Sequence, residues 1–210
     1  MGLIFSYIWR TDEEEQDAEE EEEEDGPWSL QELQQKCRQT PEGLMELNLQ
    51  NCGLTSVPSS VFRLEEVQIL NISWNKLTHL SAGIGALRQL QVLHVEHNQL
   101  SSLPAELADC ANLAELHAGW NSLSCLPARY RRMTNLKVLS LYSNDFKSLP
   151  DSVPLMTSLE YADFEHNSLK GLPMSLSKSK VKVLKLGMNQ FQHVPLVLVS
   201  MPSLEILDIC

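Results

Sequence analysis

The 210-residue sequence lacks the motifs that mark common enzymes and cofactor sites. It has no Gly-x-x-x-x-Gly-Lys phosphate loop, no Gly-x-Ser-x-Gly elbow and no His-Glu-x-x-His metal motif. Its five cysteines are odd in number and none has Cys-x-x-Cys spacing, so neither a thiolate zinc site nor a disulfide framework is predicted. We therefore expect no catalytic residues, no cofactor, no small-molecule substrate and a reducing compartment.

Long apolar runs are also missing, and this bears on membranes. No run of about twenty apolar residues occurs, so no membrane-spanning helix is predicted. The apolar start, residues 2–9, lacks the basic flank and the cleavage site of a secretion signal. The chain does begin MGLIFS, which fits the N-myristoylation pattern at Gly2, and residues 1–10 resemble the myristoylated helix of Arf-like GTPases. We expect a cytoplasmic protein whose lipid-anchored N-terminus makes peripheral membrane contact.

Positive charge is scarce, and the excess of negative charge has one origin. Twelve acidic residues and no basic ones lie between Asp12 and Asp25. Without them 16 of the 28 acidic residues remain, equal to the 16 Lys and Arg residues. Nucleic acid is therefore not expected as a partner, because phosphate binding needs clustered positive charge. We predict that residues 11–27 form a disordered acidic linker, with docking of this run on a basic patch as the alternative.

What the sequence has in abundance is a repeat. The pattern Leu-x-x-Leu-x-Leu-x-x-Asn-x-Leu recurs at steps of 23 residues, with one step of 22. Its copies start at Leu44, Val67, Leu90, Leu113, Leu136, Leu159, Val181 and Leu204. Such a fixed period predicts a solenoid in which each copy contacts only its neighbours.

Each repeated position has a physical role. The alternating leucines predict a short strand with one apolar face. The asparagine after each strand can bond backbone groups at the turn, and stacked copies predict a ladder. Two further apolar positions predict buried columns on the convex side. The first holds Val61, Ile84, Leu107, Tyr130, Val153, Leu176 and Leu198, and the second holds Leu64, Leu87, Cys110, Met133, Met156 and Met201.

This repeat resembles the intracellular class of leucine-rich repeats, of about 23 residues, found in Ras-pathway scaffolds and related signalling adaptors, and the resemblance covers residues 44–210. It implies an α/β repeat fold: a right-handed leucine-rich-repeat solenoid with a parallel concave sheet and a short helical or irregular convex side. It also implies a scaffold or adaptor that binds a protein partner in intracellular signalling. The alternative is the regulatory repeat region of a larger enzyme, such as a phosphatase, kinase or ligase.

The two ends of the repeat array differ. Ser29 and Glu32 form a capping-box pattern, which predicts a capping helix from about Leu30 to Arg38 within residues 28–43. At the other end the eighth copy stops after its strand, at Cys210, so we expect seven complete copies and a truncated eighth. This ending favours a chain that is a fragment of a longer protein.

The register of the repeat also predicts which side chains face outward from the concave sheet. Exposed aromatics and four of the six histidines gather there, and this pattern favours a protein-binding surface. The predicted site consists of Trp74, His94, Glu96, His97, His117, Trp120, Tyr142, Tyr161, Asp163, Glu165 and His166.

Two more specific interpretations concern the same face. His94 and His117 should lie about 4.8 Å apart on adjacent strands, so partner affinity could depend on pH. A metal site that adds Glu96 is not expected, because the column should be flat and solvent-facing. Asp163, Glu165 and His166 are expected to decorate a solvated strand rather than to form a catalytic set.

Overall fold

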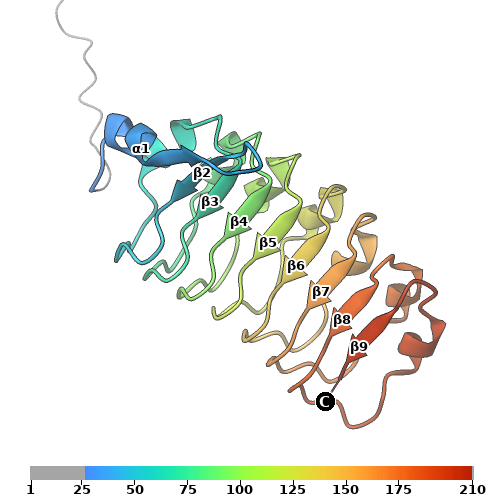
Figure 1. Cartoon of the computed structure of the whole chain (residues 1–210). Coiled ribbons are helices and arrows are strands. Elements are labelled where there is room, and N and C mark those ends of the chain that lie inside the picture. Colours follow the sequence, from blue (N-terminus) through green and yellow to red (C-terminus); the bar gives the residue numbers. More distant parts are fainter. Residues whose placement is uncertain (1–26, 210) are drawn as a thin grey trace, which may run out of the picture.

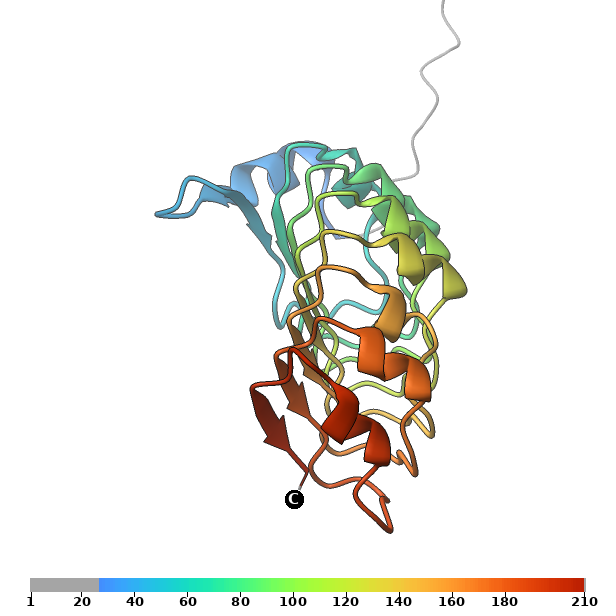
Figure 2. The ribbon, with the colours of Figure 1, turned by 90° about the vertical axis from the view of Figure 1, so that its right-hand side faces the viewer.

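The computed structural model describes residues 27–209, which form a solenoid with a single sheet along one side (Figure 1). The sheet has nine strands in chain order, β1 to β9. Figure 2 views the stack from the side, with the strands on one side of each coil and the short helices on the other. The predicted segment at residues 1–10, with Gly2, lies outside the described residues, as do Cys210 and all but Pro27 of the predicted linker at residues 11–27.

Eight of the strands are parallel and lie one repeat apart. They are β2 (Met45–Asn48), β3 (Ile69–Asn71), β4 (Val92–His94), β5 (Glu115–His117), β6 (Val138–Ser140), β7 (Tyr161–Asp163), β8 (Val183–Lys185) and β9 (Ile206–Asp208). Equivalent repeat positions pair across every strand boundary, for example Leu70 with Leu93 and His94 with His117. The 23-residue step therefore becomes the register of the sheet.

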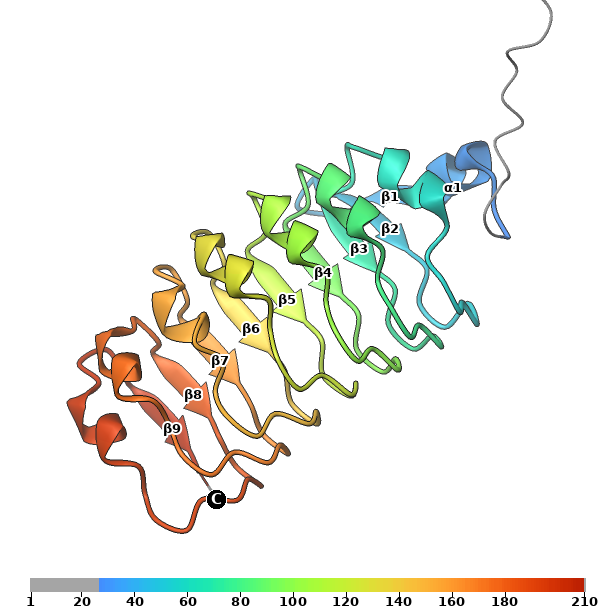
Figure 3. The same ribbon diagram turned by 180° about the vertical axis from the view of Figure 1, so that it is seen from behind.

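Short 3₁₀ helices form the opposite side of each coil (Figure 3). Their bounds are Ser59–Arg63, Ala82–Ala86, Ala105–Asp109, Ala128–Arg132, Val153–Leu155, Met174–Lys178 and Leu196–Ser200. Most follow a proline, whose carbonyl accepts the first i→i+3 bond, as Pro58 does from Val61. Both predicted convex columns are buried in one continuous core. The structure thus confirms the α/β leucine-rich-repeat solenoid.

The asparagine ladder is equally regular. Asn144 is buried; its Nδ2 donates to the carbonyls of Ala118, Leu141 and Tyr142, and its Oδ1 accepts from the Leu123 amide. The same set of bonds recurs at Asn75, Asn98, Asn121, Asn167 and Asn189. Each amide reaches its own turn and the preceding coil, so the ladder ties consecutive repeats together.

The N-terminal cap is shorter than the sequence predicted. The capping box of Ser29 and Glu32 is present, but helix α1 spans Leu30–Lys36 and ends before Arg38. Cys37–Gln39 instead forms strand β1, which pairs antiparallel with β2. This pairing satisfies backbone groups of β2 that a longer helix would leave at an open sheet edge. Within residues 27–209 no helix has the length and apolarity needed to cross a membrane.

Candidate functional site

Three residues beyond each of the strands β2 to β8, the backbone enters the left-handed region. Positive φ angles of 52° to 57° occur at Asn51, Trp74, His97, Trp120, Ser143, His166 and Met188, which we call the αL column. This conformation is unfavourable for large side chains, at a cost of about 1 kcal/mol or more each. The solenoid imposes it because the neighbouring asparagine must turn inward. Of these residues, the sequence predicts Trp74, His97, Trp120 and His166 on the concave face, but it carries no signal for the positive φ angles.

Within this column three rings stack along the solenoid. The His97 ring lies 3.7 Å from the Trp74 ring and 5.4 Å from the Trp120 ring, measured between centroids, and both pairs are nearly parallel. We call Trp74, His97 and Trp120 the aromatic stack. Both tryptophans are 53% exposed, as the sequence predicted. The structure therefore presents a rigid aromatic ridge at the strand ends of three consecutive repeats.

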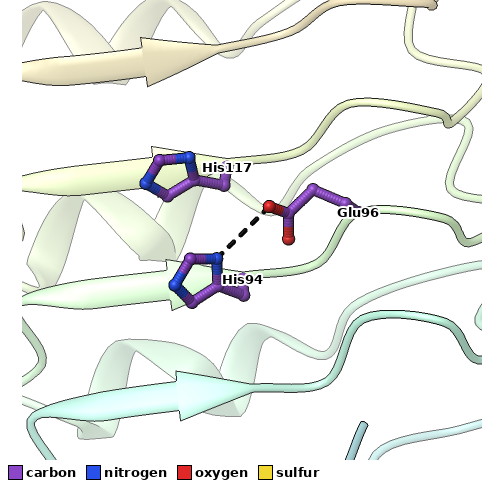
Figure 4. Close-up of side chains that lie close together, drawn as sticks. All are labelled: His94, Glu96 and His117. Carbon is purple, nitrogen blue, oxygen red and sulfur yellow. Dashed lines mark hydrogen bonds and ion pairs between the residues drawn. The ribbon is translucent and has the colours of Figure 1, made fainter. Parts of the chain in front are cut away.

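A second group lies beside the aromatic stack, on β4 and β5. The rings of His94 and His117 stack with centroids 4.6 Å apart, close to the predicted spacing. His94 Nδ1 lies 3.2 Å from Glu96 Oε1, and His117 Nε2 lies 3.1 Å from Glu115 Oε2. The hydrogen bond with Glu96 raises the pKa of His94, although partial burial opposes this shift. Figure 4 shows the Glu96 carboxylate reaching back from the loop after β4 toward both rings.

Tyr142 depends on a glycine in the neighbouring repeat. A Cβ atom on Gly119 would overlap the Tyr142 ring, so the absence of a side chain lets this ring lie across the adjacent coil. Burial raises the pKa of the Tyr142 hydroxyl. Unlike the tryptophans, Tyr142 is half-buried and contributes only part of its ring to the surface.

The predicted residues on β7 form a separate polar group. Asp163 is only 6% exposed, so the expectation that it projects into solvent is wrong. Its carboxylate accepts hydrogen bonds from the Tyr161 hydroxyl and the Glu165 amide, which draw it down onto the strand. Burial, followed by the charge of Asp163, raises the pKa of Glu165. Asp163 therefore orders its neighbours and is not available to a partner.

Two charged residues outside the predicted set belong to these groups. Glu115 holds His117, and Lys185 on β8 faces Tyr161 and Glu165, which raise the pKa of Lys185. The repeat register carried the signal for both, because Glu115 lies two residues before His117 on β5 and Lys185 lies on the strand next to Tyr161. The predicted site is thus divided into an aromatic and histidine-rich part on repeats two to five and a polar part around β7. His166 is exposed in the αL column next to the second part.

Comparison with known proteins agrees with the repeat and the fold. A family model described as a leucine rich repeat matches residues 42–100. The sequence matches no curated protein at a significant level. The family match over residues 42–100, the parallel sheet and the solved structures described next agree on a leucine-rich-repeat fold.

Three solved structures illustrate the similarity. A leucine-rich-repeat protein of Leptospira interrogans is 28% identical, with a TM-score of 0.64 over 78% of this chain and 48% of that one. An internalin of Listeria monocytogenes is 19% identical, with a TM-score of 0.64 over 74% of this chain and 45% of that one, and shows the fold alone. The ectodomain of the Arabidopsis thaliana receptor kinase GASSHO1/SCHENGEN3, in complex with CASPARIAN STRIP INTEGRITY FACTOR 2, is 26% identical, with a TM-score of 0.55 over 73% of this chain and 22% of that one. The chain therefore spans slightly less than half the length of each of the first two structures.

Proposed function

We propose that this protein binds a protein or peptide partner through its concave face, with the aromatic stack as the anchor. The observation that carries the proposal is the pair of half-exposed tryptophans, held parallel through His97. Interface hot spots are enriched in tryptophan because a large rigid ring buries much apolar area and loses little entropy.

The surroundings of the stack suit an interface. The ridge is apolar, whereas the neighbouring face carries His94, Glu96 and Glu115, which supply a polar rim. The backbone of the stack is already fixed in the αL conformation, so ordering it on binding costs little. Two exposed tryptophans on one face, in the repeats on either side of His97, would otherwise disfavour solubility without benefit.

The comparisons support a partner of this chemical class. The plant receptor kinase ectodomain was solved in complex with a named factor, and its fold is shared by this chain. Leucine-rich-repeat proteins are generally binding modules and not enzymes. An adaptor role in intracellular signalling, and membrane contact through Gly2, remain proposals that rest on the sequence patterns alone.

The test compares partner capture by wild type and by a Trp74→Ala/Trp120→Ala double variant. Affinity capture with mass spectrometry identifies the bound proteins, and the dissociation constant of each purified binder is then measured with both baits. We expect the double variant to lose at least about 2 kcal/mol of binding free energy, as hot-spot residues do.

Met188→Ala is the matched control, because Met188 is exposed in the same αL column three repeats beyond Trp120. Its binding should equal that of wild type, and circular dichroism should be the same for all three proteins. Undiminished binding by a folded double variant contradicts the assignment of the anchor.

A further inference from the structure

We propose that His94, Glu96 and His117 form a Zn²⁺ site on the concave face. The inference does not depend on a protein partner. Each of the three residues offers one ligand atom, and no two of these atoms are more than 4.8 Å apart. Two imidazoles and one carboxylate are a ligand set that Zn²⁺ takes in proteins, with a fourth position left to water or another ligand.

The distances fit a metal with little rearrangement. Ligands at about 2.0 to 2.1 Å around a tetrahedral ion lie roughly 3.3 Å from one another. His94 Nδ1 and Glu96 Oε1 already lie 3.2 Å apart, with a hydrogen bond where the ion would bind. The remaining separations must shrink by at most about 1.5 Å, which rotation of a histidine or glutamate side chain can supply.

The Glu96 side chain provides a second, independent argument for a bound cation. Its Oε2 atom is buried and has no hydrogen-bond partner. A carboxylate oxygen that accepts no hydrogen bond from the protein is costly to bury. A divalent cation beside the carboxylate would offset the cost of burying this oxygen. Neither imidazole does so, because neither donates a hydrogen bond to it.

The residues around the three ligands make the kind of hydrogen bonds that hold metal-bound histidines in place in other proteins. His117 bonds Glu115 through Nε2, which leaves the other ring nitrogen, Nδ1, as its ligand atom. A carboxylate on the second nitrogen fixes the tautomer and orientation of a metal-bound histidine. His94 is also close to Glu46 and Glu115, so the surroundings are negative and attract a cation.

The sequence predicts a flat, solvated column and hence no metal site, but the side chains are arranged otherwise. Those of His94, Glu96 and His117 are 32%, 18% and 22% exposed, because the two rings stack and the glutamate folds back against them. This arrangement brings three donor atoms together beside β4 and β5.

The experiment uses the full chain, freed of metal by chelation and kept reduced. Co²⁺ is the spectroscopic probe, because tetrahedral Co²⁺ absorbs strongly in the visible whereas Co²⁺ on a solvated acidic run does not. Zn²⁺ is then added to displace the Co²⁺, and calorimetry gives the stoichiometry of Zn²⁺ binding.

We expect one tetrahedral Co²⁺ per chain, displaced by one Zn²⁺. The variants His94→Ala, Glu96→Gln and His117→Ala should each weaken Zn²⁺ affinity at least tenfold, and Glu115→Gln by about tenfold.

The controls separate this site from other donors. His97→Ala removes a neighbouring half-buried imidazole and should leave Zn²⁺ affinity unchanged. A Cys52→Ser/Cys125→Ser variant removes the two thiols that are exposed in the described part of the chain. Metal binding by these thiols would be detected by thiolate charge-transfer absorption. Glu96→Gln keeps the size of the side chain, and a rise in melting temperature with Zn²⁺ in wild type but not in this variant provides a second readout. Absence of tetrahedral Co²⁺, or affinity that survives in all three ligand variants, overturns the site and leaves a hydrogen-bonded cluster only.

Discussion

Two adjacent columns of the solenoid differ in how strictly the fold restricts their residue type. The asparagine column has one residue type in six consecutive repeats, with nearly identical hydrogen bonds in each. The αL column immediately before it has nearly identical backbone angles but contains Asn, Trp, His, Ser and Met. Uniform geometry therefore does not require a uniform residue.

The difference follows from where the side chains point. An asparagine amide faces buried or half-buried backbone groups that recur at the same places in every coil. A side chain of the αL column projects from the strand ends, so the fold determines its backbone and leaves its identity open. Trp74, His97 and Trp120 occupy positions that a small polar residue would fill with less strain, and this departure points to binding.

The largest expected effect comes from the asparagine column. Asn144→Ala removes three donated bonds and one accepted bond, and it leaves the buried Leu123 amide without its acceptor, whereas the Ala118 carbonyl keeps the bond from Asn121. We expect a loss of about 3 kcal/mol in the free energy of unfolding, measured by urea denaturation. The control is Ser143→Ala in the adjacent αL position, which should change stability by less than about 0.5 kcal/mol. Equal effects of the two variants would break the distinction between the columns.

A smaller effect is expected from a buried position whose residue type varies. Burial raises the pKa of the Cys110 thiol to about 12, from 9.0 in the unfolded chain. The neutral thiol is favoured in the folded state, so its contribution is complete below pH 9 and declines as pH rises toward 12. The free energy of unfolding should fall by about 1.4 kcal/mol per pH unit within this range.

Denaturation at about pH 8 and pH 10.5 measures this decline. Cys110→Ala should show a shallower pH dependence, with the remainder due to the Cys37 thiol and the Tyr130 hydroxyl, whose pKa values burial also raises. The same slope in Cys110→Ala and wild type would show that Cys110 titrates like a solvated thiol.

The smallest effect on stability is expected within the αL column itself. Trp120→Asn replaces a large ring with a residue that tolerates positive φ, which offsets the lost contact with His97. Its free energy of unfolding should stay within about 0.5 kcal/mol of wild type. Trp120→Val should be less stable than Trp120→Asn by about 1 kcal/mol, because a β-branched residue adopts this conformation poorly. Equal stability of the two variants would remove the backbone argument for this column.

Much of the fold could be read from periodicity. The spacing of Leu70, Leu93 and Leu116 predicts a parallel register, and the sheet pairs these residues directly. The buried convex columns and the Ser29 capping box followed from the same local patterns. Strand β1 did not, because its pairing depends on the open edge of β2 and not on the short Cys37–Gln39 segment.

Only part of the candidate site could be predicted from the sequence. Register placed the two tryptophans and the paired histidines on one face. It could not predict that Asp163 turns inward, that Gly119 admits the Tyr142 ring or that Glu96 reaches back to His94. These outcomes depend on side-chain rotamers and on neighbours in the next coil.

The sequence by itself determined the period, the strand register and the columns to which each side chain belongs, because these follow from hydrophobic spacing and from one recurring asparagine. The tertiary structure alone decided how neighbouring columns meet. Stacking at about 5 Å per repeat brings residues 23 positions apart into ring contact, and it converts a linear pattern into the aromatic stack and the His94–Glu96–His117 cluster.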